Sequence, residues 1–228
     1  MHTVLKGLAA ANGKPPEMVD WTDFIKFEGI VYQSIHGPGP PRIPGERTFT
    51  EADLGDLLYR VAFRVQDYVG VSYRAQDGDS GFLVPGTPVF AVKDYSPRFR
   101  LAALQDGKVL VFEADFNRNA RTGADLLDIE GKVRAVTFYD ETEPNYMDNE
   151  IARVDEPGVV ADIVSMVMAA PVDQTQLDRG DERYLVVFWL DDGSAVERWY
   201  RLESGRLSRG IQLPAEFAKY LPSGGEGE

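Results

Sequence analysis

Residues 77–86, DGDSGFLVPG, contain the four letters Gly-Asp-Ser-Gly that surround the nucleophile of trypsin-like proteases. A nucleophilic serine needs an imidazole base and an acid that orients that base. The one plausible base is His36, which lies 44 residues before Ser80 in a Pro/Gly-rich stretch. Phe82 and Leu83 replace the Gly-Pro that follows the protease motif. We therefore predict that Ser80 is not catalytic and that these residues form a turn.

Residues 115–128, DFNRNARTGADLLD, carry side-chain oxygens at the spacing of a calcium-binding loop. Aspartate or asparagine stands at positions 1, 3 and 5 of that pattern, where alternate side chains converge on a hard cation. Position 6 lacks the usual glycine and position 12 the usual glutamate, so Asp125 or Asp128 would have to supply the further carboxylate. An Asx-rich connection that bonds its own backbone explains the same letters. The candidate Ca²⁺ ligands are Asp115, Asn117, Asn119 and Asp125.

Other catalytic chemistry has less support. The chain holds 37 acidic residues, so a pair can be chosen anywhere for acid–base or glycosidase chemistry and no pair is favoured. The absence of cysteine from the sequence excludes thiol nucleophiles and cysteine zinc sites. The sequence contains no Gly-rich phosphate loop and no dinucleotide fingerprint. We therefore name no catalytic residue and leave open whether the protein is an enzyme.

Three aromatic residues, Trp189, Trp199 and Tyr200, lie on a predicted C-terminal hairpin. Exposed rings at these positions would stack on a sugar or on a partner protein. A hairpin in a folded domain needs one buried face, so we expect at least half of these rings to belong to the core.

The negative charge is unevenly distributed along the chain. Residues 1–139 hold 16 Lys+Arg against 18 Asp+Glu, whereas residues 140–228 hold 8 against 19, and the net charge is −13. An acidic surface repels phosphate groups, so nucleic acid and anionic membranes are excluded as expected partners. Cations or basic proteins fit this charge better, and a solvated acidic surface explains it equally well.

The elements that position these residues are mainly strands in the N-terminal part. Asp106-Gly107 predicts a tight hairpin turn between two apolar arms. Thr50 before EADLGDLL predicts an N-cap and a short helix over 51–58, followed by a strand over 59–65. The run HGPGPPRIPG predicts an exposed loop with polyproline II character. Further extended segments are predicted within residues 23–35, 81–92, 99–114 and 132–140.

The C-terminal part mixes both kinds of element. Apolar residues at helical spacing after Pro157 predict one amphipathic helix that ends before Pro171. Two strands flank Asp191-Asp192-Gly193-Ser194 as a second hairpin, and a last short helix follows Pro214. The predicted fold class is therefore α+β: a mainly antiparallel β N-terminal region, then a smaller α+β region with the amphipathic helix packed on an antiparallel hairpin.

The predicted division of the chain follows from these patterns. We expect a tail over 1–19, a mainly β domain over 20–130, an α+β domain over 131–222 and a disordered tail over 223–228, with the boundary between Gly123 and Glu150. No run approaches the roughly 18 consecutive apolar residues that a membrane helix needs, and the N-terminus is too weakly apolar for a signal peptide. We therefore expect a soluble chain without a transmembrane segment.

One stretch resembles a known group of sequences. Gly86-Thr87-Pro88, the run from Tyr95 to Ala102 and the nearby TGADLLDI resemble a loosely defined group of uncharacterised bacterial proteins that are often exported or lipoprotein-like. The resemblance covers about the middle third of the chain and implies an extracytoplasmic location. Tyr95, Phe99 and Leu101 have the character of packing residues. Arg98 and Arg100 alternate with them, and we expect them to bind an anion or to pair with acids of the C-terminal part.

Two functional hypotheses from different classes follow. The favoured one is a non-catalytic extracytoplasmic binding or accessory module whose ligand is an unknown protein or small molecule. The alternative is a hydrolase that uses carboxylates, with a divalent cation such as Ca²⁺. An enzyme would bring at least two titratable groups with shifted pKa values into one cleft, whereas a binding module would present a surface patch.

Overall fold

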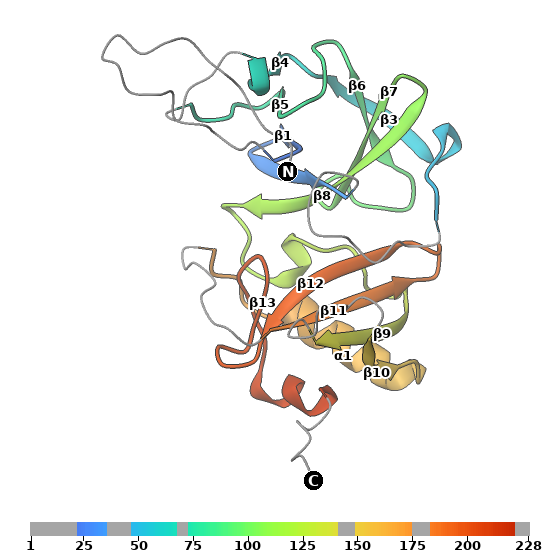
Figure 1. The fold of residues 1–228 in the computed structure, drawn as a ribbon, viewed down its shortest axis with the longest axis vertical. Helices are drawn as coiled ribbons and strands as arrows, with labels where there is room; N and C mark the ends of the chain where they lie inside the picture. The colour runs from blue at the N-terminus through green and yellow to red at the C-terminus, as the bar shows by residue number, and fades with distance from the viewer. Residues whose placement is uncertain (1–21, 36–46, 68–72, 141–148, 175–182, 222–228) are drawn as a thin grey trace. The chain divides into compact units, whose positions relative to one another are not determined.

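A computed structural model describes residues 22–35, 47–67, 73–140, 149–174 and 183–221. The chain divides into two compact units, and both are built mainly from strands (Figure 1). Unit 1 takes in Met1–Pro40 and Phe49–Arg118, and unit 2 takes in Pro41–Thr48 and Asn119–Glu228. With one α-helix in the described ranges and two sheets in which every strand pair but one is antiparallel, the fold class is α+β, as predicted. The domain ranges expected from the sequence stay a prediction.

The described residues of unit 1 form one sheet of eight strands. Its order is β3-β6-β7-β8-β2-β1-β5-β4, and every neighbouring pair is antiparallel except the parallel pair β4–β5. The strands are β1 (Phe24–Phe27), β2 (Ile30–Ser34), β3 (Leu54–Arg60), β4 (Phe63–Arg64), β5 (Asp79–Ser80), β6 (Pro88–Val92), β7 (Arg100–Gln105) and β8 (Lys108–Asn117).

The two ends of this sheet meet. β3 and β4 stand at opposite ends of the strand order, yet Val61 and Ala62 alone separate them along the chain. The Val61 amide donates to the carbonyl oxygen of Thr87 (2.9 Å), just before β6, and the Ala62 amide donates to that of Gly78 (2.8 Å), just before β5. Because consecutive residues bond opposite ends of the sheet, the sheet curls round and closes in the manner of a small barrel.

Apolar side chains from all around the sheet form the core of unit 1. The rings of Phe27 and Tyr59 stack with centroids 4.8 Å apart, which links β1 to β3 although these strands are not neighbours in the sheet. Burial of such a set is the main favourable contribution to folding. The buried core residues are Ile25, Ile30, Tyr32, Val61, Leu83, Val89, Leu101, Ala103, Phe112 and Ala114.

The helix predicted over 51–58 is wrong. Glu51–Asp53 form one turn of 3-10 helix, η1, and the chain then enters β3. The register of β3 against β6 shifts between Leu54 and Leu57 and again between Leu57 and Tyr59. Each β-bulge inserts an extra residue and breaks the two-residue repeat, so a bulged strand can carry leucines at helical spacing. A second 3-10 turn, η2 (Val65–Asp67), follows β4.

The hairpin predicted at Asp106-Gly107 is confirmed. It joins β7 to β8, with Gln105 paired to Lys108, and the turn residues have φ angles of +52° and +73°. Positive φ at both central positions is what a two-residue hairpin turn requires, and Gly107 adopts it without steric cost.

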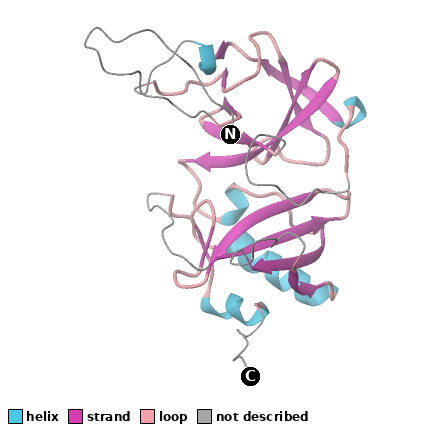
Figure 2. Cartoon of the chain, in the orientation of Figure 1, coloured by secondary structure: helices cyan, strands magenta, loops and turns pink. Residues whose placement is uncertain are grey.

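The described residues of unit 2 form a second sheet, in which all strand pairs are antiparallel. Figure 2 shows strands in magenta and helices in cyan. The strand order of this sheet is β10-β9-β11-β12-β13-β14. The strands are β9 (Val133–Asp140), β10 (Glu150–Val154), β11 (Arg183–Leu190), β12 (Ala195–Arg201), β13 (Arg206–Leu207) and β14 (Ile211–Gln212). The helical elements are η3 (Gly123–Asp125), α1 (Pro157–Ala169) and η5 (Ala215–Tyr220).

The amphipathic helix predicted after Pro157 is confirmed as α1, which packs against β9 and η3. The Glu156 carboxylate caps its first turn by accepting from the amides of Gly158 and Val159. The last predicted helix is present as the 3-10 helix η5. No helix in the ranges that the structure describes is long and apolar enough to cross a membrane.

The two faces of the unit 2 sheet differ. On one face, which we call the inner face, Tyr200 and Phe138 contact the ring of Phe217 from η5, with centroid distances of 4.9 and 6.2 Å. Because side chains alternate along a strand, Tyr139 and Trp199 lie on the opposite face. We call that side the aromatic face.

Candidate functional site

Ser80 is a buried structural residue. It lies in β5, pairs with Ile25 of β1, and has no exposed surface. Its Oγ accepts a hydrogen bond from the Leu83 amide (3.0 Å), while the neighbouring Asp79 carboxylate accepts from Tyr73 Oη (2.7 Å) and from the Gln76 amide (2.6 Å). His36 lies outside the described residues. The polar side chains of this motif shape the turn into β5.

The four candidate Ca²⁺ ligands belong to different parts of the fold. Asp115 and Asn117 lie in β8 of unit 1, whereas Asn119 and Asp125 belong to unit 2. The Asp125 carboxylate accepts from the amides of Arg121 (2.8 Å) and Thr122 (3.0 Å), which caps η3. Within the described ranges, no group of three or more His, Cys, Asp or Glu side chains is placed to hold a metal. The calcium site stays a prediction.

Thermal denaturation with Ca²⁺ and with a chelator tests this site. If the four side chains bind Ca²⁺, a hundredfold excess over the dissociation constant will stabilise the protein by about 2.7 kcal/mol. Asp115→Asn will abolish the difference, because a carboxylate is a stronger ligand for this hard cation than an amide. Identical melts of the native protein in Ca²⁺ and in chelator would remove the hypothesis.

The arginine expectations are partly corrected. Arg100 forms an ion pair with Glu113 of its own hairpin (Nη2 to Oε1, 2.7 Å), whereas the partners expected from the sequence were an anion or acids of the C-terminal part. Arg98 precedes β7 and is exposed. The Arg100–Glu113 pair could have been predicted from the hairpin. A turn at Asp106-Gly107 that pairs residue 105 with residue 108 also pairs residue 100 with residue 113. Tyr95, Phe99 and Leu101 are buried, as predicted.

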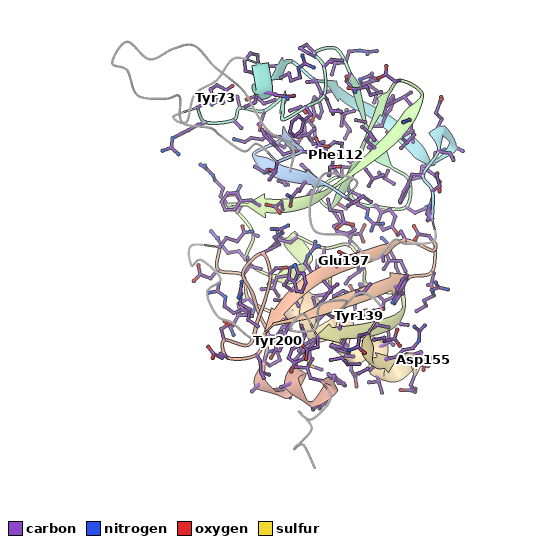
Figure 3. The ribbon with its side chains drawn as sticks, in the orientation of Figure 1. Tyr73, Phe112, Tyr139, Asp155, Glu197 and Tyr200 are labelled. Atoms are coloured by element: carbon purple, nitrogen blue, oxygen red, sulfur yellow. The ribbon has the colours of Figure 1, made fainter. Side chains whose placement is uncertain are left out.

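The aromatic face of unit 2 brings residues from three strands together. On it, Val187 of β11 pairs with Thr137 of β9 on one side and with Glu197 of β12 on the other. Leu185 is flanked in the same way by Tyr139 and Trp199. Figure 3 labels Tyr139 and Glu197 on this sheet. The face thus combines an apolar centre with an acidic side chain.

The tryptophans of this face are half-buried, whereas Val187 at its centre is fully buried. The indole N–H of Trp189 donates to Thr137 Oγ1 (2.9 Å), which fixes the ring on the sheet. Burial raises the pKa of the Tyr139 hydroxyl above its usual value, and the Glu150 carboxylate, which accepts from that hydroxyl at 3.4 Å, adds to the shift. Of the three aromatics singled out in the sequence, Tyr200 alone belongs to the inner face.

A second unusual group, missed in the sequence, is Asp23 in unit 1. It precedes β1 and is half-buried, and its Oδ1 is fully buried without a hydrogen-bond donor. Burial raises the pKa of the Asp23 carboxyl to about 6, although a hydrogen bond with Ser34 opposes the shift. Nothing in the local sequence signals this, because desolvation depends on how the chain packs around the group.

Comparisons with known proteins provide no relative. No protein-family model, no curated protein and no solved structure matches this chain.

Proposed function

We propose that the protein is a non-catalytic, extracytoplasmic binding module whose ligand lies on the aromatic face of unit 2. The observation that carries the proposal is the placement of Trp189, Trp199 and Glu197 on one side of the sheet, with both indoles half-buried. The extracytoplasmic location rests on the resemblance of residues 86–102 to exported proteins.

Physical chemistry favours these side chains as contact residues. A tryptophan ring supplies a large contact area at a small cost in side-chain entropy, and tryptophans are enriched among the residues that dominate binding energies. The hydrogen bond from Trp189 to Thr137 orients one ring before any ligand arrives, which lowers the entropy that binding would cost. Helix α1, on this proposal, lies against the β11–β12 hairpin from the inner face and keeps the sheet rigid.

Intrinsic fluorescence offers a direct test. The third tryptophan, Trp21, lies outside the described residues, so in Trp21→Phe protein the emission reports on the aromatic face alone. We expect neutral oligosaccharides with an exposed sugar-ring face to shift this emission on titration. Trp199→Ala will weaken the tightest of these complexes about tenfold or more, the usual cost of removing a dominant contact residue.

The control for this experiment is Leu202→Ala, which removes an exposed apolar side chain just after β12 and will leave affinity unchanged. Loss of binding in both variants would indicate a general disturbance of unit 2. Binding that survives the removal of both Trp189 and Trp199 would place the ligand elsewhere and contradict the proposal.

A further inference from the structure

The start of β1 is held from two sides. On one side, the Ser34 amide at the end of β2 donates to the carbonyl oxygen of Asp23 (2.8 Å). On the other, the Gly81 amide after β5 donates to the carbonyl oxygen of Phe24 (2.8 Å). The backbones approach so closely here that a Cβ on Gly81 would lie 2.5 Å from the carbonyl oxygen of Thr22. The backbone at Asp23 is therefore part of a tightly packed junction.

This junction is poorly suited to a negative charge. Among the described residues, Asp23 Oδ1 is buried and accepts no hydrogen bond, and the side chain of Ser34 hydrogen-bonds to the carboxyl group. Ser34 is itself buried, so water does not reach the hydroxyl that hydrogen-bonds to Asp23. An ionised carboxylate in such a site loses hydration that one hydroxyl does not replace, whereas the neutral acid loses much less.

We propose that Asp23 is a proton-responsive latch: its neutral form holds the start of β1 between β2 and the residue after β5, and its ionised form loosens that end of the strand. The latch lies in unit 1 and is independent of the binding face proposed in unit 2. It makes the N-terminal end of β1 sensitive to pH in the mildly acidic range.

The charged surroundings of Asp23 do not offset this effect. The influences on its pKa are burial and Ser34, with no contribution from a charged side chain of the described residues. The neighbouring segments contribute Ser34 from β2 and Gly81 after β5, and neither residue carries a charge. The Gln66 amide of η2 donates to the Gly81 carbonyl oxygen, and Gln66 is also uncharged. The acid nearest along β5, Asp79, already accepts from Tyr73 and the Gln76 amide.

The direction of the response follows from the pKa of Asp23, which is 3.8 for an exposed carboxyl and about 6 in the folded protein. A pKa raised by folding means that protons favour the closed state, so the stabilisation is complete below the ordinary value and is lost as the pH rises through 6. If opening restores the ordinary pKa, the equilibrium constant for opening increases about tenfold between pH 5 and pH 7.5.

Hydrogen exchange followed residue by residue tests the latch. After correction for intrinsic exchange rates, we expect the protection factor of the Ser34 amide to fall about tenfold between pH 5 and pH 7.5. The Gly78 amide, which donates to the Lys26 carbonyl oxygen near the other end of β1, will keep its protection. In Asp23→Asn, a neutral isostere, the protection of Ser34 will no longer depend on pH.

Asp77→Asn is the matched control, because it neutralises an exposed acid whose carboxylate accepts from the Gly29 amide in the β1–β2 turn. This variant will retain the native response at Ser34. An equal pH response in native protein and Asp23→Asn would overturn the proposal. A direct ¹³C titration of the Asp23 carboxyl needs no variant: a midpoint near 6 supports the latch, and a midpoint near 3.8 would overturn it.

Discussion

Glu113→Ala will destabilise unit 1 by about 3–5 kcal/mol, the usual cost of breaking a buried ion pair by removing one of its members. The Arg100 side chain has no exposed surface, and its Nε and Nη2 atoms donate to Glu113 Oε1 at 3.0 and 2.7 Å. The guanidinium carbon also lies 4.5 Å from the ring centroid of Tyr95 and 5.0 Å from that of Phe99. Removing the carboxylate takes both of these charged hydrogen bonds away from the guanidinium, and a cation–π contact at a desolvated site is worth only about 2 kcal/mol.

The double variant Arg100→Met with Glu113→Leu separates the charge from the packing. Replacing a buried ion pair with apolar side chains of similar volume is often neutral or stabilising, so we expect this variant to recover most of the loss. Urea denaturation followed by circular dichroism measures both effects, and Arg98→Ala, at an exposed position, will change stability by less than about 0.5 kcal/mol. A Glu113→Ala protein within 1 kcal/mol of the native one would show that the pair is not needed for stability.

Gly123→Ala will destabilise unit 2 by about 3 kcal/mol, at the upper end of the cost of overpacking. The Gly123 amide donates to the Ala170 carbonyl oxygen (2.9 Å), which places η3 against the C-terminal end of α1. A Cβ at this position would lie 2.0 Å from the Val167 carbonyl oxygen. Since that atom belongs to the helix backbone, the clash can be relieved only by moving η3 away from α1.

Gly158→Ala is the matched control for this substitution. It makes the same chemical change in the first turn of α1, where the nearest atoms to a new Cβ are the Glu156 carboxylate oxygens at 3.3 Å. A flexible side chain can move by that amount, and alanine is intrinsically a better helix former than glycine. We therefore expect Gly158→Ala to be neutral or mildly stabilising in the same urea experiment. Equal losses in both variants would contradict the steric argument.

Local patterns in the sequence determined the elements whose formation depends on neighbouring residues. Asp106-Gly107 specified its hairpin because the turn requires positive φ, and the apolar spacing after Pro157 specified α1 because one face of a helix must be buried. A predicted hairpin also fixes which residues face each other, so the pairing of Arg100 with Glu113 was within reach of the sequence.

Tertiary structure alone decided the features that arise where distant segments meet. The leucines of β3 have helical spacing, yet this segment pairs with β6 as a strand that contains two bulges. Pairing with a neighbouring strand contributes more to the stability of this segment than its local helix propensity does. The closure of the sheet through Val61 and Ala62 depends on hydrogen bonds to residues 78 and 87. The raised pKa of Asp23 has the same origin, because desolvation is set by the atoms that surround a group in space and leaves no trace in the residues beside it in the chain.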